Sequence, residues 1–396
     1  MELGLVGKPN VGKSTFFAAA TMAPAAIASY PFTTIEPNRG IAYVRTPCPH
    51  LELGHACSPV SAPCRDGTRF VPVELLDVAG LVPKAHEGRG LGNKFLDDLR
   101  QASALIHVVD ASGGTDFEGN LVKPGTHDPL EDVRFLEEEI AHWIRGILER
   151  NWEKDARRAD LDETPAERIV HDRVAGLGLT DNQVHLAVRD AALDARLARW
   201  TRDDMLRLAA ALLRRGKPMM VAANKADIAP VEVLSRLTSL EDRRVVRVAA
   251  EMELALRRGA KAGLVEYEPG AASFRIPEPG RLSAAQASGL HRVEEYLAAH
   301  GDTGVQRCIE DAVWKLLNLI VVFPVEDETH WTDKKGNVLP DAFFVPLGAT
   351  ARDLAYRVHT DLGKNFIRAI NARTKMVVGQ DYAVRNGDVL KIVARA

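Results

Sequence analysis

The chain lacks three features that would place it in a special class. None of its apolar runs approaches the roughly 18 residues of a membrane-spanning helix, so no membrane partner is expected. Residues 1–6 carry neither a basic stretch nor a long apolar segment, which argues against a signal peptide and favours a cytoplasmic protein. The sequence also has no internal repeat or low-complexity tract. Its 396 residues, 46% of them hydrophobic, are expected to form about two or three globular domains.

Positive charge is not in excess either, because the formal net charge is −3. Any affinity for nucleic acid must therefore come from a local patch. Residues 364–396 contain seven basic residues but only two acidic ones, Asp381 and Asp388. The basic residues are Lys364, Arg368, Arg373, Lys375, Arg385, Lys391 and Arg395. Such a patch can bind a phosphate backbone without reading its sequence, although it is also compatible with the solvated surface of a small domain.

Cysteine is scarce, and three of the four cysteines lie close together in the sequence. Cys48, Cys57 and Cys64 share a proline-rich segment with His50. A disulfide is not expected in a reducing cytoplasm, which leaves free thiols or a metal site as the two interpretations. Zinc accepts a tetrahedral set of Cys48, His50, Cys57 and Cys64, with His55 as a competing nitrogen ligand. The spacing is not a standard zinc pattern.

Short apolar runs alternate with helical patterns through much of the chain. The expected strands are residues 3–6, 40–45, 71–76, 104–109, 218–223 and 245–249. This alternation predicts an α/β fold with a parallel sheet. Residues 116–216 instead show apolar positions at helical spacing and are predicted to form a helical insertion, with Asp181 capping one helix. A second helical stretch is expected over residues 284–320.

The last part of the chain has a different pattern. Strands are expected at residues 321–325 and 389–393, and a helix at residues 351–362. Residues 336–340 are expected to turn into another strand. These elements predict a small α+β module.

The segment GKPNVGKS at residues 7–14 fits the phosphate-loop pattern, and it follows a strand and opens a helix. Its glycines let successive N–H groups point at phosphates, and the helix N-terminus adds a positive dipole. Lys13 can neutralise the β- and γ-phosphates, and the Ser14 hydroxyl can bind Mg²⁺. The segment therefore predicts a site for a nucleoside triphosphate with magnesium.

Two further segments are expected to complete the phosphate and magnesium site. Asp77 ends a strand in the sequence DVAG, where its carboxylate can hold Mg²⁺ through water and the Gly80 N–H can contact the γ-phosphate. Between the phosphate loop and Asp77, a threonine can close over the metal as a mobile switch. Thr34 is preferred for this role, with Thr33 as the alternative.

The sequence NKAD at residues 224–227 follows another strand and indicates the nucleobase. The Asp227 carboxylate can accept hydrogen bonds from both the ring N1–H and the exocyclic amine of guanine. Adenine has no N1–H and no amine at C2, so it would leave the acceptor unpaired, and GTP is favoured. The last guanine contact is assigned to Ala249 and Ala250, where the backbone N–H of Ala250 can meet the guanine O6.

These motifs together resemble the Obg/YchF family of translation-associated GTPases, and in particular its archaeal YchF-like branch. The resemblance is carried by residues 7–15, 30–38 and 77–96, and the C-terminal module resembles a TGS domain at residues 333–340, 349–362 and 387–393. It covers nearly the whole chain. Some YchF-like proteins have a changed guanine motif and accept ATP, whereas this chain keeps Asn224, Lys225 and Asp227. The family usually has Ser-Ala where this chain has Ala249-Ala250.

The resemblance implies a P-loop GTPase domain with a parallel sheet and a helical insertion, followed by an α+β β-grasp (TGS) domain. The implied boundaries are 1–115 and 217–280 for the GTPase domain, 116–216 for the insertion, 281–320 for a helical linker and 321–396 for the TGS-like domain. The nucleotide-binding residues would be Asn10, Val11, Gly12, Lys13, Ser14, Thr15, Asn224, Lys225, Asp227, Ala249 and Ala250. The Mg²⁺ ligands would be Ser14, Thr34 and Asp77.

The implied activity is hydrolysis of GTP to GDP and phosphate by a monomer that acts as a nucleotide-dependent switch. Its partner would be the ribosome or RNA, contacted through the TGS-like domain and the helical insertion. The alternative is a nucleotide hydrolase or ATPase without a ribosomal role. Turnover should be slow, because Leu81 stands where many GTPases have a water-orienting glutamine.

Three residues are candidates for catalysis. Asn10 resembles the asparagine of potassium-activated relatives, in which K⁺ supplies positive charge to the transition state. His86 could instead reach the attacking water, and Gly80 would contact the γ-phosphate. His107 is a weaker candidate, because a histidine within an apolar strand is more often structural.

Overall fold

The computed structural model describes residues 1–22, 38–78 and 98–395 and forms two compact units. Among these residues, the first unit contains 1–22, 38–39, 74–78 and 98–308, and the second contains 40–73 and 309–395. The predicted site residues Thr33, Thr34, Gly80, Leu81 and His86 lie outside the described residues. Among the described residues, every helix is too short or too polar to span a lipid bilayer. The predicted domain boundaries remain a prediction.

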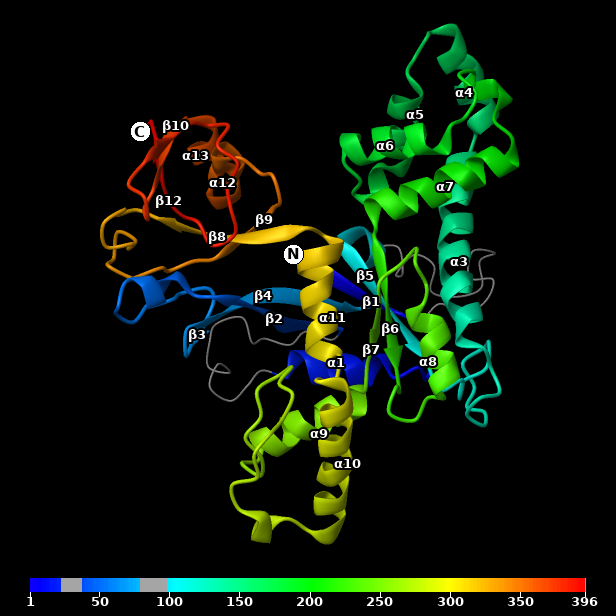
Figure 1. The fold of residues 1–396 in the computed structure, drawn as a ribbon. Helices are drawn as coiled ribbons and strands as arrows, with labels where there is room; N and C mark the ends of the chain where they lie inside the picture. Colours follow the sequence, from blue (N-terminus) through cyan, green and yellow to red (C-terminus); the bar gives the residue numbers. More distant parts are fainter. Residues whose placement is uncertain (23–37, 79–97, 396) are drawn as a thin grey trace. The chain divides into compact units, whose positions relative to one another are not determined.

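The larger sheet has the strand order β2-β4-β1-β5-β6-β7 (Figure 1). Its strands are β1 (Glu2–Val6), β2 (Arg39–Pro47), β4 (Thr68–Asp77), β5 (Ala104–Asp110), β6 (Met219–Asn224) and β7 (Val245–Arg247). From β4 to β7 every neighbouring pair is parallel, as predicted. All residues of β5 are buried, which explains its uninterrupted apolar sequence. The short strand β3 (Cys64–Arg65) pairs antiparallel with β4 and was not predicted.

Helices flank this sheet and form the predicted insertion. Outside the insertion, the described residues of the first unit form α1 (Lys13–Thr21), α8 (Val231–Thr238), α9 (Ala250–Lys261), α10 (Ala284–His300) and the start of α11 (Val305–Asp311). The insertion consists of α3 (Pro129–Glu149), α4 (Trp152–Leu161), α5 (Ala166–Val174), α6 (Asp181–Ala191) and α7 (Arg202–Gly216). Figure 1 shows α3 as a long helix with α4, α5, α6 and α7 gathered at one end. Trp152 and Trp200 stack in the core of this group, with ring centroids 5.2 Å apart.

The predicted cap of α6 was wrong by one residue. Thr180, not Asp181, is the N-cap, because its hydroxyl accepts a hydrogen bond from the Gln183 N–H. The Gln183 side chain accepts in return from the Thr180 N–H, which completes a capping box. Asp181 lies in the first turn, where its negative charge faces the positive end of the helix dipole.

The helical stretch predicted over residues 284–320 was too long. Helix α10 ends at His300, where Gly301 takes the left-handed conformation that terminates many helices. After α11 a π-helical segment (Ala312–Leu316) follows, and strand β8 begins at Leu319. The β-branched residues that follow Leu319 favour a strand over a helix.

The second sheet lies in the C-terminal module and has the order β11-β10-β12-β8-β9. Its elements are β8 (Leu319–Val325), β9 (Phe343–Pro346), α12 (Ala351–Val358), α13 (Thr360–Lys364), β10 (Phe366–Asn371), β11 (Val377–Val378) and β12 (Val389–Ala394). Strand β12 is parallel to β8, and the other pairs are antiparallel. The α+β prediction is confirmed. The single helix predicted over residues 351–362 is two helices, because His359 has an extended backbone.

Candidate functional site

The phosphate loop leads from β1 into α1 through backbone that requires glycine. Gly12 has a φ of 90°, and a Cβ there would lie 2.3 Å from Asn224 Nδ2. At Gly7 a Cβ would lie 2.5 Å from the carbonyl oxygen of Val108. Helix α1 begins at Lys13 without a side-chain cap, so its first N–H groups are open to an acceptor at the loop. This arrangement suits an anion such as a phosphate.

Two predicted site residues of opposite charge meet beside the loop. Lys13 Nζ lies 2.9 Å from Asp77 Oδ1 and also donates to the carbonyl oxygen of Val78 at 2.5 Å. Ser14 follows Lys13 in the first turn of α1 and is exposed. The first unit therefore places the predicted phosphate-binding ammonium group and one predicted Mg²⁺ ligand side by side.

The NKAD segment is joined directly to the phosphate loop. Asn224 Nδ2 donates to the carbonyl oxygen of Val11 at 2.9 Å, and Lys225 Nζ donates to that of Asn10 at 3.0 Å. Lys225 also pairs with the buried Asp110 at 2.7 Å. Two segments more than 200 residues apart in the sequence thus form one site.

The backbone N–H of Ala250, which was predicted to contact guanine, has another partner in the structure. Its N–H donates to Asn224 Oδ1 at 3.1 Å, so this group holds the asparagine in place. Helix α9 begins at Ala250, and its next N–H groups also lack acceptors within the helix. A guanine contact by the start of α9 remains a prediction.

Asp227 lines a cavity of about 540 Å³ formed chiefly by residues of α9 and α10. Met252, Leu290 and Val293 contribute apolar surface, and Glu251 adds a second carboxylate. The volume falls within the range of small-molecule sites. The carboxylate predicted to select the base therefore borders open space.

A buried polar cluster beneath the phosphate loop was missed from the sequence. Lys8 Nζ lies 2.7 Å from Asp132 of α3 and donates to the carbonyl oxygen of Thr115 at 3.0 Å. His127 Nε2 lies 2.8 Å from the same carboxylate. Burial raises the pKa of Asp132, while Lys8 and His127 act in the opposite direction. No motif signals this cluster, because Lys8 occupies a variable position of the phosphate-loop pattern.

Replacing Asp132 with alanine is expected to lower the free energy of unfolding by about 3 kcal/mol, because it leaves the Lys8 ammonium buried without its counter-charge. Chemical denaturation would measure the change. Glu138→Ala is the matched control, since Glu138 is an exposed residue of the same helix outside the cluster and should change stability by less than about 0.5 kcal/mol. Equal effects of the two substitutions would contradict this role of Asp132.

His107, the weaker catalytic candidate, is enclosed in the larger sheet. It lies in β5, is only 3% exposed, and burial lowers its pKa to about 3. This burial favours the structural role that the sequence indicated for His107.

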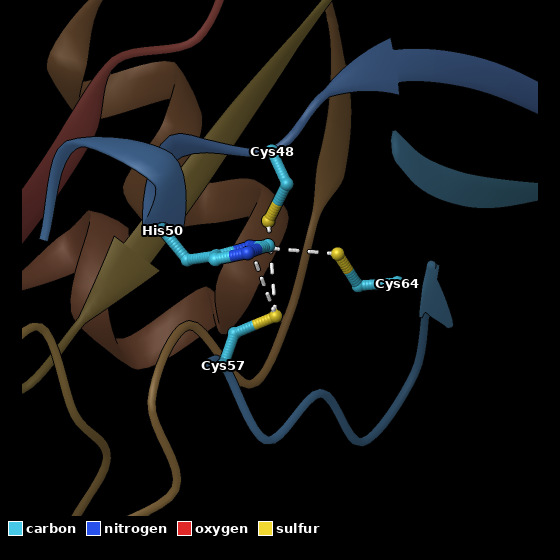
Figure 2. A group of neighbouring side chains, drawn as sticks. All are labelled: Cys48, His50, Cys57 and Cys64. Atoms are coloured by element: carbon cyan, nitrogen blue, oxygen red, sulfur yellow. Dashed lines mark hydrogen bonds between the residues drawn. The ribbon is translucent and has the colours of Figure 1, made fainter. Parts of the chain in front are cut away.

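The cysteine cluster lies in the second unit. Figure 2 shows Cys48, His50, Cys57 and Cys64 pointing at one another, from the end of β2, the turn η1 (Pro49–Glu52), the following loop and β3. Their candidate ligand atoms all lie within 4.8 Å of one another. All three cysteines are free thiols. His55, the competing nitrogen, is exposed and lies outside the group.

Three family models match the chain. The 50S ribosome-binding GTPase model matches residues 2–151. The Obg-like GTPase YGR210-like, G4 motif-containing domain matches residues 222–327, and the TGS domain matches residues 329–394.

Individual relatives match over nearly their full lengths. A GTP-binding protein of Methanocaldococcus jannaschii is 51% identical and covers 100% of this chain and 99% of its own. The ribosome-binding ATPase YchF of Escherichia coli is 30% identical, covering 99% and 98%. The crystal structure of a GTP binding protein from Pyrococcus horikoshii OT3 matches with a TM-score of 0.79 and 43% identity, covering 100% of both chains.

Proposed function

We propose, because the chain belongs to the YchF/Obg-like family of GTP-binding GTPases, that its nucleotide state controls its contact with the ribosome in the cytoplasm. The GTPase activity follows from membership of the family, and the ribosomal partner is the proposal. One matching family model describes a 50S ribosome-binding GTPase, and the relative from Escherichia coli is named ribosome-binding. Both descriptions support a ribosomal role.

The nucleotide part of the proposal rests on the joining of the phosphate loop to the NKAD segment. Asn224 and Lys225 fix the loop carbonyls of Val11 and Asn10, so the groups for the phosphates and for the base belong to one rigid site. We place the triphosphate at Lys13 and guanine at Asp227. In this structure the Lys13 ammonium group pairs with Asp77. With nucleotide bound, it would pair with the negatively charged phosphates instead.

Magnesium is the metal that this chemistry needs, because it neutralises charge on the β- and γ-phosphates. The Ser14 hydroxyl and the Asp77 carboxylate are hard oxygen ligands of the kind that Mg²⁺ prefers. Thr34 would complete the set from the segment outside the described residues. The hydroxyl, the carboxylate and Lys13 all lie at the carboxyl ends of neighbouring parallel strands, where α/β folds bind ligands.

Potassium is proposed as the activating cation. The side-chain amide of Asn10 donates through Nδ2 to the carbonyl oxygen of Gly119 at 3.0 Å, which fixes its orientation. A K⁺ ion would use the amide oxygen as a ligand and supply positive charge near the phosphates. This arrangement would compensate for Leu81, which cannot orient water. His86 is the alternative group that could orient the attacking water.

The ribosome contact is assigned to part of the basic C-terminal segment. Three of its seven basic residues already have partners: Arg373 pairs with Glu52, Lys391 pairs with Glu328, and Lys375 donates to the backbone of Glu328. The other four are exposed and form no ion pair with any described residue. They are Lys364, Arg368, Arg385 and Arg395. These four are the basic residues best placed to meet phosphate.

The test is GTP turnover in K⁺ or Na⁺, with and without ribosomes. We expect K⁺ to raise kcat about tenfold over Na⁺ and ribosomes to raise it further. Asn10→Gly should remove the potassium effect, and glycine is chosen because the φ of 63° at this position strains other side chains. Fast turnover in Na⁺ without ribosomes would instead support a housekeeping hydrolase.

Co-sedimentation with ribosomes in the presence of GTP or GDP measures nucleotide-dependent binding independently of GTP hydrolysis. The double variant Arg368→Ala/Arg385→Ala should weaken binding about tenfold without changing turnover of free GTP. Arg281→Ala, which removes an exposed arginine of the first unit, is the control and should bind normally. Equal binding in the GTP and GDP states would overturn the proposed switch.

A further inference from the structure

The second unit contains a buried arginine that has no acidic partner among the described residues. Arg69 in β4 is 0% exposed, and no carboxylate of the described residues forms an ion pair with it. Its Nη1 donates to the carbonyl oxygens of Ala62 and Leu339 at 3.1 and 3.0 Å, and its Nη2 donates to Cys48 Sγ at 3.3 Å. Neutral carbonyls do not cancel a buried positive charge, which is costly unless it is paired. The thiol group of Cys48 is the one contact that can become an anion.

The four side chains beside Arg69 have the spacing of a tetrahedral metal site. His50 Nδ1 lies 3.3 Å from Cys57 Sγ and 3.5 Å from Cys64 Sγ, and the sulfurs of Cys48 and Cys57 are 3.9 Å apart. Zinc bonds of about 2.3 Å to sulfur and 2.0–2.1 Å to nitrogen give tetrahedral edges of about 3.8 Å between sulfurs and about 3.6 Å from nitrogen to sulfur. These three separations are close to the tetrahedral edges, and the remaining pairs lie within 4.8 Å of one another. They are also far longer than a disulfide bond of about 2.0 Å.

We propose that Cys48, His50, Cys57 and Cys64 bind one structural Zn²⁺ ion and that Arg69 is the counter-charge of the complex. Three thiolates, one neutral imidazole and Zn²⁺ leave a single negative charge, which matches the single positive charge of the buried guanidinium. Four protein ligands fill the tetrahedron and leave no open position for a substrate, so the site is structural rather than catalytic. Thiolate and imidazole are ligands that favour zinc over magnesium or calcium.

The proposed ion would attach the cysteine-bearing segment to the C-terminal module. Next to Cys57, the Ser58 N–H donates to the carbonyl oxygen of Val338, and the Val60 N–H donates to that of Pro340. Arg69 adds its bond to Leu339 in the same stretch. Zinc at the cluster would therefore hold the cysteine-bearing segment in the shape that contacts residues 338–340. Both segments belong to the second unit.

Metal analysis of the full chain, purified under reducing conditions without chelator, is the first test. We expect about one zinc per chain in the unmodified protein and less than about one fifth of that in Cys57→Ser and His50→Ala. His55→Ala is the matched control, since it removes the neighbouring exposed histidine, and Cys308→Ala removes the cysteine outside the group. Both controls should keep one zinc.

Two measurements on the unmodified chain keep the test independent of whether the variants fold. Cobalt added to the metal-free chain should give the visible bands of tetrahedral thiolate coordination, and zinc should abolish them at one equivalent. Zinc should also protect Cys57 and Cys64, the two cysteines of the group that are not buried, from alkylation. A chain that takes up neither metal, carries iron instead, or forms a disulfide under reducing conditions would overturn the zinc site.

Arg69 is tested by competition with a chelator. Arg69→Gln should hold zinc at least about tenfold more weakly than the unmodified chain, because the negative complex loses its charge partner. Arg65→Gln, which removes an exposed arginine next to Cys64, should leave zinc affinity unchanged. Equal affinities in the two variants would show that Arg69 is not the counter-charge. None of these measurements depends on nucleotide or ribosome binding.

Discussion

Lys13→Ala is expected to weaken GTP binding about a thousandfold, or about 4 kcal/mol. The ammonium group would make charge-assisted hydrogen bonds to the β- and γ-phosphates, and each such bond contributes about 1.5–3 kcal/mol. Backbone N–H groups of the loop remain in the variant, but they cannot replace a full positive charge. Titration with a fluorescent GTP analogue and Mg²⁺ measures the affinity directly.

The control for this substitution is Lys154→Ala, which removes an exposed lysine of α4. It should bind GTP with unchanged affinity. Loss of Lys13 also leaves Asp77 without its partner at 2.9 Å, so the stability of both variants is measured by thermal unfolding. Because the two side chains are only 14% and 19% exposed, a loss of stability is expected beside the loss of binding. A Lys13→Ala chain that is folded and binds GTP normally would place the phosphates elsewhere.

The parts of the site that could be predicted from the sequence are those fixed by local backbone chemistry. Gly7 and Gly12 need positive φ or close backbone approach, and a strand before them and a helix after them are visible in the hydrophobic pattern. The buried strand β5 was likewise recognised from its continuous apolar sequence. In each case the information lies within about ten residues of the feature it predicts.

The parts that could not be predicted depend on contacts between distant segments. Lys8 and Asp132 are 124 positions apart. Lys8 occupies a variable position of the phosphate loop, and Asp132 belongs to no motif. Arg69 and Leu339 are 270 positions apart. The sequence identified the cysteine and histidine residues of the cluster as a possible zinc set. It gave no periodic signal for the turn η1 and the short strand β3, which bring His50 to Cys57 and Cys64.

Base selection cannot be carried over from relatives without a test. One relative at 51% identity is described as GTP-binding, whereas another at 30% identity is named an ATPase. This chain keeps the NKAD sequence, and its Asn224 and Lys225 hold the phosphate loop while Asp227 borders open space. Because Asn224 and Lys225 hold the phosphate loop, we expect that Asp227 can be substituted without disturbing the loop.

Asp227→Asn is expected to change the base preference of the site from guanine to xanthine. The carboxylate would accept from the N1–H and the amine of guanine, whereas the asparagine amide offers one acceptor and one donor. Xanthine has a carbonyl in place of that amine, so its N1–H can donate to the amide oxygen and its C2 carbonyl can accept from the amide nitrogen. GTP affinity should fall at least about a hundredfold, and xanthosine triphosphate affinity should rise by a similar factor.

Competition binding of GTP, ATP and xanthosine triphosphate to both chains measures the exchange. The gain of a new ligand matters more than the loss of GTP, because a misfolded variant would lose all three nucleotides together. The unmodified chain should bind ATP at least about a thousandfold more weakly than GTP, since adenine leaves the carboxylate unpaired. If the unmodified chain bound ATP as tightly as GTP, or if the variant failed to gain xanthosine triphosphate, Asp227 would not contact the base.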